Sequence, residues 1–118
     1  MLDKNELASS TELEIAIPEN GFSTELIEAL YGICAKQKIL LEAYLVLKKV
    51  DEDVSLLLGL LFSGTNTIDQ QEQEIQLILS EVTNLFSDGL AVDAICLNLH
   101  TQLKESIISV TSPFYKRG

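Results

Sequence analysis

The chain has 118 residues, and its 18 acidic side chains against 8 basic ones give a formal net charge of −10. Hydrophobic residues nevertheless make up 47% of it, and the mean hydropathy is +0.22. These values exclude a disordered acidic tail, because disorder accompanies low hydrophobicity. The negative net charge argues against nucleic-acid binding, which needs a basic surface. Two cysteines are too few for a disulfide or zinc scaffold.

One globular domain is expected over residues 12–118, after a loose polar segment at residues 1–11. The first residues lack the basic start and apolar stretch of a signal peptide, and no run has the length of a membrane span. Cys34 and Cys96 form no C-x-x-C motif and lie in apolar stretches, which is typical of reduced core thiols. We therefore expect a cytoplasmic protein with no membrane partner.

The first elements are predicted to be a strand and a helix. Leu13, Ile15 and Ile17 alternate with other residues, which is the period of a strand with one buried face. Residues 18–21 contain proline and glycine and end that strand. Ser23 is then placed to cap a helix, because its hydroxyl can accept a hydrogen bond from a first-turn amide.

A hairpin is predicted next. Apolar and polar residues alternate over residues 41–48, whereas residues 54–62 are apolar at nearly every position. The second run is typical of a strand covered on both faces. The acidic residues 51–53 between the two runs form the expected turn.

Two more helices and a strand follow. Thr67 and Gln70 have capping-box spacing before an apolar helical stripe, and Gly89 is placed to end that helix. Residues 92–99 are predicted to form a fourth strand. Thr101 is expected to cap a short third helix that stops before Pro113.

The order β-α-β-β-α-β predicts an α+β, ferredoxin-like sandwich. Its sheet would be antiparallel, with two helices on one face and a short C-terminal helix in addition. The opposite face would be apolar enough to mark a contact site, and Ala16 is expected there as well. The predicted interaction surface combines this face with two aromatic residues of the tail: Tyr44, Val46, Leu57, Leu61, Ile95, Leu97, Phe114 and Tyr115.

Three covers for this face are open: the C-terminal helix, a partner domain, or a second copy in a homodimer. Between Lys49 and Lys104 there are nine acidic residues and no basic one. They form either an ordinary solvated surface or one that favours a basic protein partner over nucleic acid and anionic lipid.

Catalytic equipment is sparse in this sequence. His100 is the sole histidine, and no phosphate-binding glycine motif or nucleophile elbow occurs. We therefore expect no catalytic residues, no cofactor and no metal. A small-ligand sensor is the alternative to an interaction module, and it would use the polar groups most able to converge: Tyr44, Cys96, His100 and Tyr115.

Three segments resemble a known family. Residues 112–117, Ser-Pro-Phe-Tyr-Lys-Arg, resemble the ending of the C-terminal domain of the enhanced serine sensitivity protein SseB. Residues 24–30, Thr-Glu-Leu-Ile-Glu-Ala-Leu, are similar to its first helix, and residues 42–45, Glu-Ala-Tyr-Leu, to one of its strands. Pro18 stands where that family has a proline after its first strand.

The resemblance extends over about residues 13–117 and implies no assigned active site. The apolar second sheet face and the missing catalytic groups favour a non-enzymatic protein-interaction or regulatory module, with a sensor of a small amino-acid-like ligand as the alternative. An unrelated type III secretion translocator shares the name SseB, so a role in secretion would depend on that name alone. The chain lacks the upstream domain that full-length members carry, and it is either a stand-alone version or an excised piece.

Overall fold

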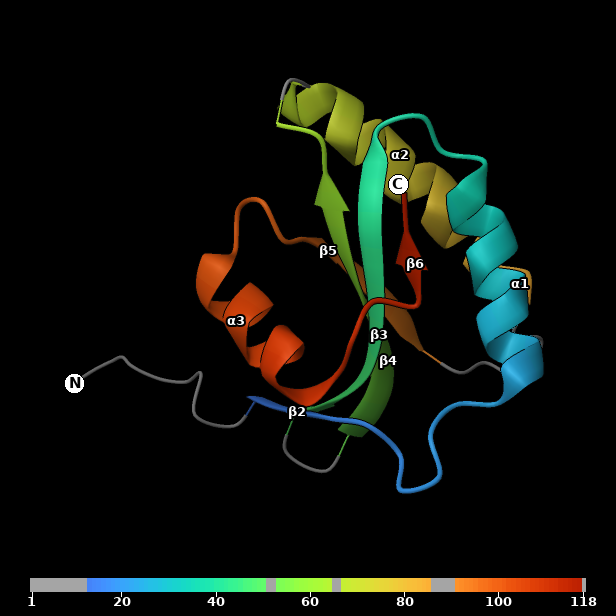
Figure 1. Cartoon of the computed structure of the whole chain (residues 1–118), viewed down its shortest axis with the longest axis vertical. Helices are drawn as coiled ribbons and strands as arrows, with labels where there is room; N and C mark the ends of the chain where they lie inside the picture. The colour runs from blue at the N-terminus through green and yellow to red at the C-terminus, as the bar shows by residue number, and fades with distance from the viewer. Residues whose placement is uncertain (1–12, 51–52, 65–66, 86–90, 118) are drawn as a thin grey trace.

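The computed structural model describes residues 13–50, 53–64, 67–85 and 91–117. Within these ranges strands and helices alternate along most of the chain, as Figure 1 shows. The elements are β2 (Leu13–Ala16), α1 (Thr24–Ala35), β3 (Leu40–Val50), β4 (Asp53–Phe62), α2 (Ile68–Thr83), β5 (Val92–Cys96), α3 (Thr101–Val110) and β6 (Tyr115–Lys116).

Two of the predicted helix starts are confirmed. The Ser23 hydroxyl accepts a hydrogen bond from the Leu26 amide at 3.1 Å, and Thr67 forms a reciprocal capping box with Gln70. The third start is corrected, because Thr101 is the first residue of α3 and the residue before it makes no side-chain cap bond. Gly89, the expected end of the second helix, lies outside the described residues.

The sheet is mixed rather than antiparallel. Its strands run in the order β2-β3-β4-β5, and β6 pairs with β3. The pairs involving β3 are antiparallel, but β4 and β5 are parallel because α2 carries the chain back between them. The α+β class is confirmed. The expected antiparallel sheet is wrong for the β4–β5 pair, and the strand order does not confirm a ferredoxin-like arrangement.

One edge of β3 is shared by two strands from opposite parts of the chain. β2 pairs with the second half of β3, over residues 47–50. β6 pairs with Glu42 and Ala43 in the first half. The amides of Phe114 and Arg117 extend this contact by donating to the carbonyls of Ala43 and Leu41 at 2.9 and 2.8 Å. The C-terminal tail is therefore part of the sheet.

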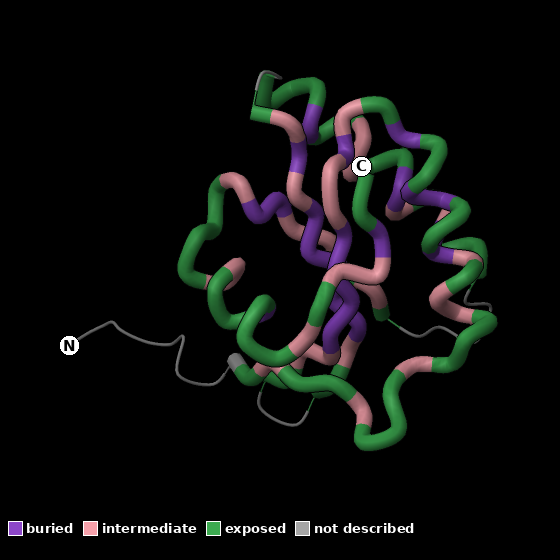
Figure 2. Tube along the Cα trace, viewed as in Figure 1, coloured by how far each residue is buried: buried purple, intermediate pink, exposed green. Residues whose placement is uncertain are grey.

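Helices α1 and α2 pack against the same face of the sheet, as expected. They bury a large cluster against the odd residues of β3 and the even residues of β4. Its fully buried members include Leu30, Leu58 and Ile78. Figure 2 shows that the buried residues concentrate in the central strands, while the outer faces of the helices are exposed.

Helix α3 covers the opposite face of the sheet. A second cluster joins Ile107 of α3 to four buried residues of the sheet and the turn after β5: Tyr44, Val46, Leu57 and Leu97. Gly59 lets the helix approach β4 closely, because a Cβ atom there would lie 3.2 Å from the Ile107 Cδ1 atom. Of the three covers that the sequence left open, the C-terminal helix lies over this face.

Candidate functional site

The predicted interaction surface is mostly buried within the chain. Tyr44, Val46, Leu57 and Leu97 lie beneath α3, and the half-buried Leu61 and Ile95 pack against the same cluster. The tail aromatics Phe114 and Tyr115 belong instead to the cluster under α1 and α2. These eight residues therefore form no single exposed surface, because α3 and the sheet separate them into two cores.

Ala16 is also on the other face from the one expected. It pairs with Leu47, which packs on the α1–α2 side, whereas Ile15 packs under α3. Ile15 of β2 thus faces α3. The predicted strand is confirmed over Leu13–Ala16, but Ile17 lies beyond it and is 43% exposed. The alternation also does not indicate which helix covers the strand.

The outer edge of β5 is one of the two open edges of the sheet in the described ranges, and the outer sides of β2 and β6 form the other. The Ala91 carbonyl and the Leu97 amide bond to β4, at 3.0 and 2.8 Å. Neighbouring residues in a strand direct their backbone groups to opposite sides. Val92 and Ala94 therefore direct their amides and carbonyls away from β4, into the space beside the sheet.

A hollow lies on each side of this edge. The first, of about 440 Å³, lies between β5 and α2 and is lined by Glu72, Ile75, Gln76, Ala94, Ile95, Cys96, Leu99 and His100. The second, of about 560 Å³, lies beside the start of α3 and is lined by Ile95, Leu99, His100, Thr101, Gln102 and Leu103. Ile95, Leu99 and His100 border both hollows, so the two meet at the edge of β5.

Buried polar contacts fix the end of β5 between these hollows. The Cys96 thiol donates to the Gln71 Oε1 atom at 3.2 Å, and Gln71 is itself buried. The Asn98 side chain accepts from the Phe62 amide at 2.8 Å and donates to the Phe62 carbonyl at 2.9 Å. The Asn98 side chain thus bonds to β4 at the point where the β5 backbone turns away. This explains why the strand stops at Cys96 rather than at Leu99.

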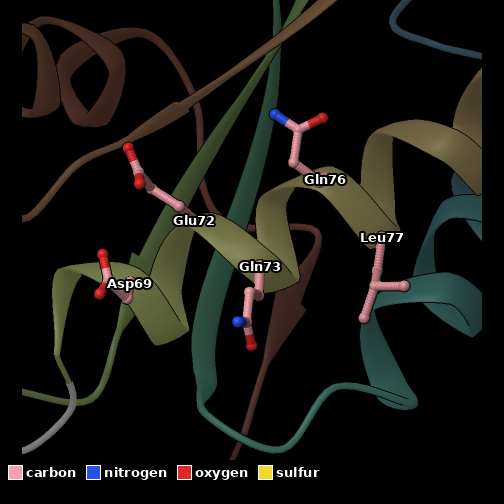
Figure 3. A pocket seen from close by; sticks show the side chains of 5 residues that line it. All are labelled: Asp69, Glu72, Gln73, Gln76 and Leu77. Carbon is pink, nitrogen blue, oxygen red and sulfur yellow. The ribbon is translucent and has the colours of Figure 1, made fainter.

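A negatively charged depression on the exposed side of α2 adjoins the hollow between β5 and α2. A shallow depression of about 640 Å³ is lined by Asp69, Glu72, Gln73, Gln76 and Leu77, all from consecutive turns of this helix (Figure 3). Glu72 and Gln76 line both this depression and the hollow beside β5. Asp69 lies in the first turn of α2, where the helix dipole stabilises its carboxylate, and Glu72 lies one turn later.

A separate hollow of about 410 Å³ lies where the α1–β3 connection meets α2. Glu74 lines it, and its Oε2 atom accepts weak hydrogen bonds from the amides of Lys38 and Ile39, at 3.2 and 3.4 Å. The Glu74 Oε1 atom is buried without a hydrogen-bond partner. On this connection, the Arg117 guanidinium donates to the carbonyls of Gln37 and Lys38.

Two titratable groups of the core, Cys34 and Tyr44, have raised pKa values that favour their protonated forms. Burial raises the pKa of the Cys34 thiol to about 12. Burial also raises the pKa of Tyr44 to about 12, aided by a 2.6 Å hydrogen bond to Glu42 and by its charge. No cluster of three potential metal ligands occurs in the described part of the chain. In the same ranges, no helix is long and apolar enough to cross a membrane.

The residues of the alternative ligand hypothesis are only partly brought together. Cys96 and His100 line the same hollow beside β5. Tyr44 and Tyr115 lie in the two cores on opposite sides of the sheet. Sequence reasoning missed Glu72, Gln76 and Leu99 beside β5, and it missed Glu74. Leu99 carried no distinguishing signal, because the sequence placed it at the end of the predicted strand 92–99, whereas the structure leaves it 57% exposed beyond β5.

Comparison with known proteins identifies the family of this chain. No curated protein and no solved structure matches the chain significantly. A family model described as the SseB protein C-terminal domain matches residues 7–117, which is nearly the whole chain and includes β5, both of its flanking hollows and the tail strand. The chain therefore belongs to the SseB protein C-terminal domain family.

Proposed function

We propose that this domain is a non-enzymatic protein-interaction module that takes an extended segment of a partner as an additional strand along β5. One observation carries the proposal: the outward backbone groups of Val92 and Ala94 are flanked by a side-chain hollow on each face of the sheet. In strand addition, backbone hydrogen bonds supply affinity and pockets for alternate side chains supply specificity.

The contacts of Cys96 and His100 argue against an alternative role as a nucleophile and base. The two residues line one hollow, but the thiol donates to Gln71 rather than to the imidazole. A nucleophilic cysteine needs a neighbouring base to become a thiolate. We place the module in the cytoplasm, because both cysteines are free thiols buried in the core.

A homodimer through the apolar sheet face stays a prediction. Since α3 already covers that face, burial of its side chains no longer provides a reason for a second copy. Self-association would more readily use the β5 edge, where two copies could join their sheets.

Amide hydrogen exchange tests strand addition directly. A binder is first selected from a displayed library of random peptides, and exchange is then followed by NMR with and without it. The outward amides of Val92 and Ala94 should exchange fast in the free protein and become protected on binding. The inward amides of Asp93 and Ile95 should be protected in both states, because they point toward β4.

Proline variants provide the matched control. Ala94→Pro removes an outward donor and should abolish binding while the protein stays folded, since proline is tolerated on the open side of an edge strand. Ile95→Pro removes an inward donor and should unfold the protein. Leu99→Ser is a second test, because this exposed residue borders both hollows. Peptides that bind without protecting Val92 and Ala94, or that still bind Ala94→Pro, would refute strand addition.

A small-ligand sensor is the second candidate, favoured by the Glu74 Oε1 atom. A buried carboxylate oxygen without a donor is costly, and an ammonium or hydroxyl group would satisfy it. Lys38 lines the same hollow and could hold the carboxylate of an amino-acid-like ligand, whereas Lys36, which also lines it, is ion-paired with Glu81. A thermal-shift screen with amino acids, serine included, tests this reading. A rise in Tm that Glu74→Gln removes would support it, and no rise at millimolar ligand would count against it.

A further inference from the structure

Each hollow beside β5 has its own chemistry, and the two therefore favour different side chains. On the α2 side the floor is apolar, from Ile75 and Ala94, while the rim carries the Glu72 carboxylate and the Gln76 amide. On the α3 side the apolar residues Ile95 and Leu103 face no carboxylate among the lining residues described. Because consecutive side chains of an added strand point to opposite faces, one hollow receives every second residue.

The α2-side hollow matches a lysine or arginine. These side chains have a long apolar stem that can lie along Ile75 and Ala94, with a cationic head that reaches the polar rim. Glu72 is exposed and forms no ion pair with the residues that the structure describes, so its charge is available to that head. Asp69 lies one turn earlier on the same helix and adds negative charge to the depression beside it (Figure 3).

The charge distribution disfavours a second copy as the occupant. A second copy would present the β5 side chain of Asp93, which is exposed and acidic rather than basic. Within each copy, Asp93 already pairs with Lys48. Two copies joined at this edge would also bring their Glu72 and Asp69 carboxylates toward one another. Each copy carries a net charge of −10, so long-range repulsion opposes their association.

We infer that the partner segment alternates basic and aliphatic residues, with its Lys or Arg side chains in the Glu72 hollow and its aliphatic side chains in the α3-side hollow. This inference rests on the strand addition proposed above and adds the identity of the bound side chains. Glu72 acts as the specificity-determining residue, and Asp69 extends its field to flanking basic residues.

Three labelled peptides of one design test the inference. They have the sequence Ser-Val-X-Val-X-Val-Ser, where X is Lys, Gln or Glu, and their binding is measured by fluorescence anisotropy. The Lys peptide should bind tightest and the Glu peptide weakest. Replacing Lys by Gln should weaken binding about two- to five-fold for each exposed ion pair lost, and added salt should reduce that difference.

Two substitutions of equal charge separate a local contact from the general field. Glu72→Gln should bring the Kd of the Lys peptide close to that of the Gln peptide. Glu28→Gln, at an exposed position on α1, should preserve the difference. Both residues are exposed, so neither substitution should unfold the protein.

The outcomes distinguish the partner inference from the proposed function. If all three peptides bind equally and protect Ala94, strand addition holds and the basic partner is wrong. If none of them binds, and library peptides fail as well, strand addition itself is refuted. A doubled mass by light scattering, with Ala94 protected in the absence of peptide, would identify a second copy as the occupant and overturn the inference.

Discussion

Removing the Ile107 side chain should show whether α3 seals the second face of the sheet. Ile107 is the one buried residue of α3, with 0% exposure, and its Cδ1 atom lies over Gly59. Ile107→Ala should therefore cost about 2–5 kcal/mol, as buried isoleucine truncations do. For a domain of this size, that cost lowers Tm by roughly 8–20 °C.

Ile108 provides a matched control, because it is the same residue type one position later and is 48% exposed. Ile108→Ala should change the free energy of unfolding by no more than about 0.5 kcal/mol. Urea unfolding followed by circular dichroism measures both costs, and binding of a hydrophobic dye reports exposure of the sheet face. Equal costs for the two variants would refute the reasoning, since α3 would then not be packed on the sheet.

Three further predictions concern the core, a helix start and the tail. The raised pKa values of Cys34 and Tyr44 mean that both protons are held more tightly in the folded state, so stability should be complete below pH 9 and fall as the pH rises toward about 12. Cys34→Ala and Tyr44→Phe should each flatten this fall in urea midpoints measured at increasing pH. Thr67→Ala removes the capping box of α2 and should cost about 1 kcal/mol in the same assay. Arg117→Ala removes two hydrogen bonds to the α1–β3 connection and should cost about 1–2 kcal/mol, whereas the exposed neighbour Lys116→Ala should cost less than about 0.5 kcal/mol.

Local chemistry made the elements predictable. Ser23 and Thr67 act as caps because their hydroxyls reach amides only three residues away. The charged and apolar patterns of residues 41–62 predicted the hairpin for the same reason, since its two strands are separated by only two residues. Each of these predictions depends on neighbours along the chain, which a single sequence displays.

Strand order and the choice of face depend on residues far apart in the sequence. Nothing in residues 92–96 indicates that this strand runs parallel to β4, and a two-residue strand such as β6 has no pattern to detect. The role of Asn98 is equally hidden, because its partner Phe62 lies on another element. The candidate site at β5 is formed by residues that are far apart in the sequence. The composition therefore predicted an acidic surface but not where on the fold it lies.

The divided edge of β3 has a consequence for how this domain forms. Only two residues separate β3 from β4, but β6 must return to β3 across roughly seventy residues, and closing a loop of that length is slow. During synthesis, the half of this edge that pairs with β6 therefore stays unpaired until β6 has been made and has left the ribosome. That interval is when the nascent chain is most exposed to pairing with the wrong strand.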